Sequence, residues 1–156
     1  MNHALSFLVA VLLATACGSA RSAVPDPDLA KVVTLEKALW NAWKTLDQNT
    51  IIRLSATDYY SINEEGPDKA VGLAEIKQDL RVAHITDFKL GPMAARRLGP
   101  DTIFVGYNAH IFGSASGKDI SRGVAEGSIW VRRDGRWLNV VLHEVTRSSR
   151  DPAVDP

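Results

Sequence analysis

Three side chains of the chain have the chemistry of a general base, and they lie far apart in the sequence. Asp58 precedes two tyrosines, whereas His110 and His143 lie within two later apolar segments. Histidine accepts and donates protons near neutral pH, and a carboxylate can do the same. These residues predict an enzyme only if the fold brings two groups together, for instance His143 with Asp58 or Glu126. Otherwise Asp58 begins a strand or caps a turn, which is common for aspartate.

The spacing of the histidines and the sequence motifs give little support for a metal ion or a cofactor. A site built from His84, His110 and His143 would lack the short ligand spacing of metal motifs, so no metal ion is expected. Cys17 is the only cysteine, which excludes an intrachain disulfide. The sequence contains neither a glycine-rich phosphate-binding loop nor the nucleophile elbow of hydrolases. No cofactor is therefore expected.

A second group of side chains could line a pocket for a small, largely apolar molecule. Such pockets have mostly apolar walls and a few convergent polar groups. The candidates are Trp40, Trp43, Tyr59, Tyr60, Trp130, Asn139 and His143. Strict strand alternation would place Trp137, Asn139, Val141 and His143 on one face. The same pattern also suits a core or a subunit interface, so the sequence leaves these alternatives open.

The elements that must position these residues follow from hydrophobic periodicity and turn residues. Apolar residues recur at helical spacing in 28–46 and 72–82, and Asn49 can cap a short helix between them. Alternating or β-branched segments predict strands over 58–63, 85–97, 102–112, 120–133 and 136–146. Gly91-Pro92 predicts a bend in the second strand, and Asp134-Gly135 predicts a tight hairpin. Helices followed by a long antiparallel meander predict an α+β domain.

Several motifs within residues 30–146 carry a family resemblance. They are residues 38–43 (ALWNAW), residues 54–60 (LSATDYY), Gly72 before a helix, and residues 129–137 (IWVRRDGRW). Their order resembles the SnoaL-like, ketosteroid-isomerase-like branch of the nuclear transport factor 2-like superfamily. The resemblance implies a cone, in which a curved antiparallel sheet wraps around three N-terminal helices as in a cystatin-like α+β barrel, with a pocket at one end. It also implies a homodimer that pairs through the outer face of the sheet.

The same resemblance argues against ketosteroid-isomerase chemistry. The family's catalytic base falls near Asn63, its acidic donor falls near Ser128, and its tyrosine on the first helix falls near Trp40. Asparagine and serine cannot replace carboxyl groups in acid–base catalysis, and indole is a weak donor. The isomerase carboxylates are therefore expected to be absent.

The N-terminus predicts export. Residues 7–16 (FLVAVLLATA) form an apolar run that is too short to cross a membrane but typical of a signal peptide. Cys17 follows directly, as the lipidated cysteine does in bacterial lipoproteins, and ordinary cleavage is the alternative. The expected organisation is a signal peptide over 1–22, a tether over 23–28, the SnoaL-like domain over 29–147 and a disordered tail over 148–156. The protein is thus expected to be periplasmic or secreted, or held at a membrane by a lipid on Cys17.

Composition narrows the choice of partners. The 156 residues include 18 Lys plus Arg and 18 Asp plus Glu, so the net charge is zero. Nucleic-acid binding needs an excess of basic residues, so no nucleic-acid partner is expected. Three hypotheses follow: a domain that binds a small apolar molecule, a module that self-associates through its sheet face, and an enzyme of the isomerase, cyclase or hydrolase type that uses a pocket His or Asp as its base.

Overall fold

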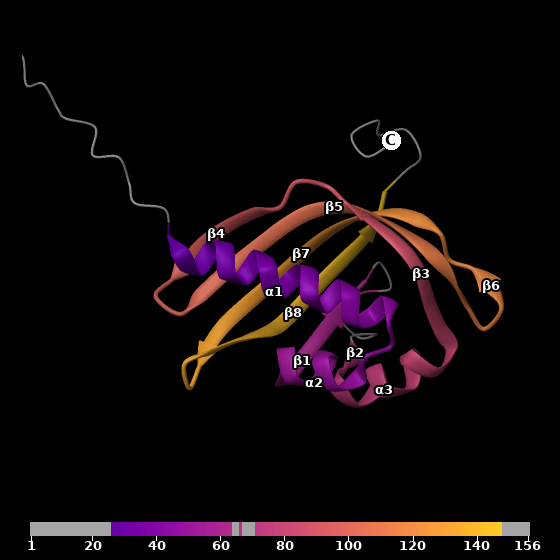
Figure 1. The fold of residues 1–156 in the computed structure, drawn as a ribbon, viewed down its shortest axis with the longest axis horizontal. Coiled ribbons are helices and arrows are strands. Elements are labelled where there is room, and N and C mark those ends of the chain that lie inside the picture. Colours follow the sequence, from indigo (N-terminus) through magenta and orange to yellow (C-terminus); the bar gives the residue numbers. More distant parts are fainter. Residues whose placement is uncertain (1–25, 64–65, 67–70, 148–156) are drawn as a thin grey trace, which may run out of the picture.

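The structure is a computed structural model that describes residues 26–63, 66 and 71–147. Its elements are α1 (Pro27–Lys44), α2 (Gln48–Leu54), β1 (Ser55–Ile62), β2 (Val71–Gly72), α3 (Leu73–Val82), β3 (Ala83–Leu90), β4 (Ala94–Gly99), β5 (Thr102–Ala115), β6 (Lys118–Asp119), β7 (Arg122–Arg133) and β8 (Arg136–Thr146) (Figure 1). The predicted signal peptide, Cys17 and the predicted tail lie outside the described residues. Among the described residues, no helix is long and apolar enough to span a membrane.

Both N-terminal helices begin at an aspartate. Asp26 caps α1, and Pro27 occupies the first helical position, where a backbone N–H would have no helical partner. The helix therefore starts inside the segment 23–28 that the sequence assigned to a tether. Asp47 caps α2, so the predicted cap at Asn49 was wrong by two residues.

The strands form one eight-stranded sheet in the order β2-β1-β8-β7-β5-β3, with β4 and β6 also paired to β5. The pairs are antiparallel except β1 with β8, which run parallel. The predicted antiparallel meander thus holds for the C-terminal strands. The first strand, β1, instead lies beside the last strand, β8. Helix α3 leads the chain from β2 at one edge of the sheet to β3 at the other edge, and the later strands then fill the sheet back toward β1. Asp134 (φ 50°) and Gly135 (φ 72°) form the predicted hairpin between β7 and β8.

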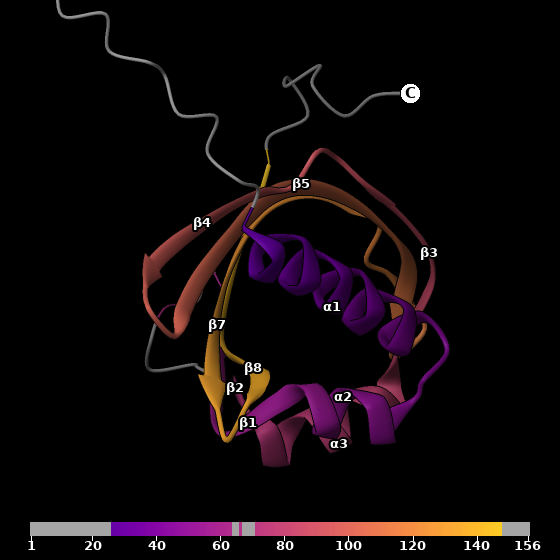
Figure 2. The same cartoon turned by 60° about the vertical axis from the view of Figure 1, so that its left-hand side comes forward.

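The sheet curves around α1, and α2 and α3 lie together across its open side (Figure 2). Burial alternates strictly along β5 and β7, so every second side chain faces α1. The innermost of these side chains are fully buried and form the core with the apolar face of α1: Ile103, Val105, Ala109, Val124 and Trp130. The α+β class and the curved, unclosed sheet agree with the prediction.

Two glycines mark the places where the edge of the sheet bends. β3 and β4 lie end to end along the same edge of β5, and the break between them confirms the bend predicted at Gly91-Pro92. Near the other end of β3, a Cβ on Gly113 would lie 2.3 Å from the carbonyl oxygen of His84. Only glycine permits so close an approach of two backbones, and the approach lies next to the register shift between Ile85 and Asp87 in the pairing of β3 with β5.

A β-bulge at Val140 divides β8 into halves that present opposite faces. Ile129 pairs with Val141 and the next residue pairs with Asn139, so Val140 has no partner on β7. Asn139 is buried on the inner face, whereas Val141 and His143 line a groove on the outer face. One inserted residue reverses the alternation of a strand. The single face predicted for Asn139, Val141 and His143 was therefore wrong.

Ion pairs fix the start of α1 to the sheet. Arg97 lies 2.6 Å from Asp26 and 2.9 Å from Asp28, and Arg132 lies 3.2 Å from Asp28. The Arg132 guanidinium also lies over the Trp137 ring, 5.2 Å from its centroid. Arg97 is on β4 and Arg132 is on β7, so these contacts hold the helix N-terminus against two strands.

Candidate functional site

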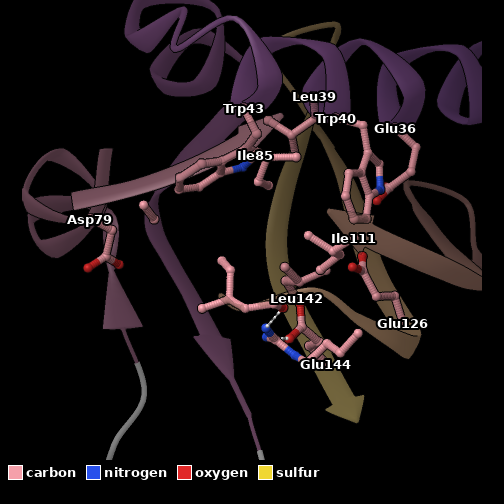
Figure 3. Close-up of a pocket in the computed structure, with 13 residues that line it drawn as sticks. Glu36, Leu39, Trp40, Trp43, Asp79, Ile85, Ile111, Glu126, Leu142 and Glu144 are labelled. Atoms are coloured by element: carbon pink, nitrogen blue, oxygen red, sulfur yellow. Dashed lines mark hydrogen bonds and ion pairs between the residues drawn. The ribbon is translucent and has the colours of Figure 1, made fainter. Parts of the chain in front are cut away.

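A cavity of about 270 Å³ lies between α1 and the inner face of the sheet (Figure 3). Helix α3 and the strands β3, β5, β7 and β8 complete its wall. The lining residues are Glu36, Leu39, Trp40, Trp43, Asp79, Ala83, Ile85, Ile111, Ile120, Arg122, Glu126, Leu142 and Glu144. A concave, mainly apolar site with a few polar groups is typical of small-molecule binding, so this cavity is the candidate site.

The polar part of the lining is acidic. Four lining residues carry carboxyl groups, whereas Arg122 is the one lining residue with a guanidinium, and it forms an ion pair with Glu144. Asp79 and Glu126 lie on opposite sides of the cavity (Figure 3). Burial and the nearby Glu75 raise the pKa of Asp79 above its ordinary value. The cavity therefore combines an apolar body with more carboxyl groups than cations.

A buried hydrogen-bond network joins α1 to the inner face of the sheet at one wall of the cavity. The Trp40 Nε1–H donates to the Tyr107 hydroxyl at 2.7 Å. The same hydroxyl lies 2.7 Å from Glu36 Oε1 and 2.7 Å from Glu126 Oε2. All four side chains are buried. Two carboxyl groups thus share one phenol between α1, β5 and β7.

The network requires a proton on one of its carboxyl groups. Burial and the neighbouring carboxyl groups keep the pKa of Tyr107 far above its ordinary value, so the phenol has one proton and donates to one partner only. Burial raises the pKa of Glu126 to about 8, which favours its protonated form near neutral pH. Glu126 therefore holds a proton at neutral pH and donates it to the phenol oxygen, while Tyr107 donates to Glu36.

Glu36 accepts hydrogen bonds at both of its carboxyl oxygens. Its Oε2 accepts hydrogen bonds from Ser128 Oγ at 2.6 Å and from Trp130 Nε1 at 2.5 Å, and its Oε1 accepts from Tyr107. Three donors around a side chain that is 1% exposed stabilise a carboxylate in the core. Ser128, which the resemblance aligned with a catalytic acid, here donates a hydrogen bond to Glu36.

Two of the predicted pocket residues line the cavity: Trp40 and Trp43. Trp130 is fully buried beneath it, bonded to Glu36, and Tyr59 is packed in the core. Tyr60, in contrast, is 43% exposed. The predicted aromatic set therefore splits among cavity, core and surface.

The remaining two predicted pocket residues lie outside the cavity lining. Asn139 is on the inner face and fully buried, but its side-chain nitrogen and oxygen have no hydrogen-bond partner among the described residues. His143 is exposed on the outer face, because the bulge at Val140 turns it away from the cavity.

The structure does not bring the predicted catalytic candidates together in the cavity. Asp58 is exposed and paired with Arg133, which holds the pKa of the Asp58 carboxyl below its usual value. His110 packs against Phe112 on the outer face, with ring centroids 4.5 Å apart. His143 lies on the same outer face. Among the described residues, no group of three or more His, Cys, Asp or Glu side chains could hold a metal ion.

Sequence reasoning missed Glu36 and Tyr107 and considered Glu126 only as a partner of His143, although the positions of these residues carried a signal. Glu36 lies on the apolar face of α1, between Val32 and Trp40 at helical spacing. Glu126 is in phase with the inward residues of β7, and Tyr107 occupies the facing position on β5. A charged residue in phase with a buried face is rare and marks a paired or functional group.

The outer face of the sheet carries a second feature, an apolar groove across β5, β7 and β8. Its outward-facing lining residues are Phe104, Ala125, Gly127, Ile129, Val141, His143 and Val145. We call this set the outer groove. The Phe104 ring lies flat over the sheet, since a Cβ on Gly127 would come within 3.0 Å of it.

No family model and no curated protein matches the sequence, but solved structures match the fold. An NTF2-like protein of unknown function in nutrient uptake from Rhodospirillum rubrum matches with a TM-score of 0.70 and 21% identity, over 75% of this chain and 98% of that one. An NTF2-like protein from Cytophaga hutchinsonii gives 0.70 and 18% identity, over 76% and 97%. The CaMKII hub of S. rosetta gives 0.66 and 19% identity, over 80% and 100%.

At these identities the similarity concerns the fold. It agrees with the fold of the superfamily that the sequence motifs resemble, and a shared fold does not by itself assign a function. The chain has the fold of the NTF2-like superfamily.

Proposed function

We propose that the chain binds a small, mainly apolar molecule in the cavity between α1 and the sheet. The observation that carries the proposal is a cavity of about 270 Å³ whose wall consists largely of aliphatic side chains and two indole rings. Burial of apolar surface supplies most of the affinity in such sites, and the few polar groups fix orientation.

The test uses a neutral, environment-sensitive fluorophore, N-phenyl-1-naphthylamine. We expect its emission to rise and shift to the blue on binding to the wild type. Leu142 lines the cavity and its neighbour Val141 lines the outer groove, so they provide a matched pair. Leu142→Trp fills the cavity and should abolish the signal, whereas Val141→Trp should preserve it. The reverse pattern would place the fluorophore in the outer groove, and no signal with the wild type would contradict the proposal.

A second function, self-association through the outer groove, has its own support. The groove exposes apolar side chains on a sheet face, and exposed apolar patches commonly mark interfaces. A CaMKII hub shares the fold. Sedimentation velocity should show the wild type as a dimer or larger and Ile129→Glu as a monomer. Leu98→Glu, at an exposed position outside the groove, is the matched control and should still associate. A monomeric wild type contradicts this function and leaves cavity binding intact.

Export, with a lipid on Cys17 or with cleavage of the leader, is part of the proposal. It is supported by the apolar run over 7–16 that ends directly before the cysteine. Mass spectrometry of the mature N-terminal peptide should find either a diacylated Cys17 or a start within residues 17–23. A retained residue 1 in protein from the native host would contradict export.

A further inference from the structure

The polar groups of the cavity distinguish among ligands of different charge. Asp79 and Glu126 line the cavity from opposite sides, and neither forms an ion pair among the described residues. The cavity's guanidinium, on Arg122, is already paired with Glu144. A ligand that carries a negative charge would meet carboxyl groups without a free cation, which is unfavourable at low dielectric constant.

Glu126 offers a defined contact point. Its Oε2 is held 2.7 Å from the Tyr107 hydroxyl, and the side chain is 7% exposed. Glu126 also lines the cavity (Figure 3). Because Tyr107 contacts Oε2, Oε1 is the carboxyl oxygen that is left for a bound molecule. Trp40 and Trp43 lie in the same lining, and indole faces attract cations.

We propose that the ligand is a primary or secondary amine: its apolar body packs against Trp40, Trp43 and the aliphatic wall, and its protonated nitrogen donates a hydrogen bond to Glu126. This inference rests on the proposed function, since it names the class of molecule that the same cavity takes. An ammonium group supplies a donor and a positive charge, whereas the guanidinium among the described lining residues, on Arg122, is already paired with Glu144. A hydrogen bond between two charged groups is about twice as strong as a neutral one, which favours an amine over an alcohol of the same shape.

Amine binding is coupled to the proton on Glu126. An ammonium group binds the ionised carboxylate, so the proton that Glu126 shares with Tyr107 must leave. The charged and titratable groups facing Glu126 are Glu36 from α1, Tyr107 from β5, Glu144 from β8 and Arg122 from β7, and Tyr59 on β1 lies within electrostatic range. Four of these five groups are acidic or phenolic, and Arg122 is the single cation, so a bound ammonium group is electrostatically favourable for the cluster.

The experiment compares three probes of one shape by isothermal titration calorimetry: 1-adamantanemethylamine, 1-adamantanemethanol and 1-adamantanecarboxylate. At pH 9 the amine should bind about tenfold more tightly than the alcohol, the margin of a charge-assisted hydrogen bond, and the carboxylate should bind more weakly than both. Between pH 6 and pH 9 the affinity for the amine should rise about tenfold or more, while the affinity for the alcohol stays constant.

Two variants assign the effect to Glu126. Glu126→Gln keeps the shape and a donor toward Tyr107, so it should bind the alcohol as the wild type does but lose both the preference for the amine and its pH dependence. Asp58→Asn removes one carboxylate outside the cavity and should change nothing. Equal affinity for amine and alcohol, or a preference for the carboxylate, would overturn the amine proposal while leaving cavity binding in place. Failure of all three probes to bind would count against both proposals.

Discussion

Tyr107 on β5 and Glu126 on β7 are cross-strand partners, and their side chains meet at 2.7 Å. The pair lies where α1 crosses the sheet, and Trp40 and Glu36 of that helix complete the network. Buried polar networks of this kind are favourable only when every donor and acceptor is matched. The stability of the domain and the chemistry of its cavity therefore depend on the same hydroxyl group.

Tyr107→Phe should lower the free energy of unfolding by about 2–4 kcal/mol, because the missing hydroxyl removes the hydrogen bonds to Trp40 Nε1, Glu36 Oε1 and Glu126 Oε2 in the core. Urea unfolding at pH 7 measures the loss. Tyr60→Phe is the control, since Tyr60 is 43% exposed and should tolerate the change within about 0.5 kcal/mol. Equal losses of unfolding free energy in the two variants would show that the buried Tyr107 hydroxyl contributes no more to stability than the exposed Tyr60 hydroxyl.

Glu126→Gln should change the dependence of stability on pH. The pKa of Glu126 rises from 4.5 to about 8 on folding, so between these values the folded chain holds a proton that the unfolded chain has lost. The wild type therefore loses stability relative to the variant as pH rises from about 4.5 to about 8, and the difference is constant above that range. Urea unfolding of both proteins from pH 5 to pH 9 gives the curve. A difference that does not vary with pH would mean that Glu126 is ionised in the folded chain throughout.

Asn139→Leu should stabilise the domain by about 1 kcal/mol. The side chain is fully buried, and neither of its polar atoms has a hydrogen-bond partner among the described residues. Replacing such a group by an apolar one of similar shape removes a desolvation cost. Thermal unfolding of wild type and variant measures the change, and a clear loss of stability would show that the amide is in fact satisfied.

Arg97→Met should lower the Tm, because Arg97 holds both Asp26 and Asp28 at the start of α1. Arg97 keeps the pKa of each aspartate below its ordinary value of 3.8. The contribution is therefore present above pH 4 and disappears as pH falls through the lowered pKa values. Arg96→Met, one residue away at an exposed position, is the matched control. Equal Tm values for the two variants at pH 7 would contradict the role of the ion pairs.

Local patterns predicted most of the fold. The bounds of β8, the hairpin at Asp134-Gly135 and the bend at Gly91-Pro92 all depend on neighbouring residues, which a sequence displays directly. The parallel pairing of β1 with β8 does not depend on neighbours. It arises from the path of the whole chain, so periodicity could not reveal it.

The site was harder to predict because alternation assumes an unbroken strand. His143 was assigned to the cavity side, and the bulge at Val140 places it on the outer face. Trp40 and Trp43 both line the cavity, because the regular helix α1 keeps these two positions on the face that its spacing indicates. Glu36 was not considered, and Glu126 was considered only as a partner for His143, although each falls in phase with a buried face. The pairing of Tyr107 with Glu126 needs strand register, which composition does not contain.

The bulge also means that register decides which functional groups enter the cavity. Beyond Val140, Leu142 and Glu144 line the cavity, and Val141 and His143 line the outer groove. Deleting one residue at the bulge would exchange the two sets, putting an imidazole in the cavity wall and a carboxylate in the outer groove without altering any other side chain. Deletion of one codon would therefore replace one of the four carboxyl groups of the cavity lining with a histidine.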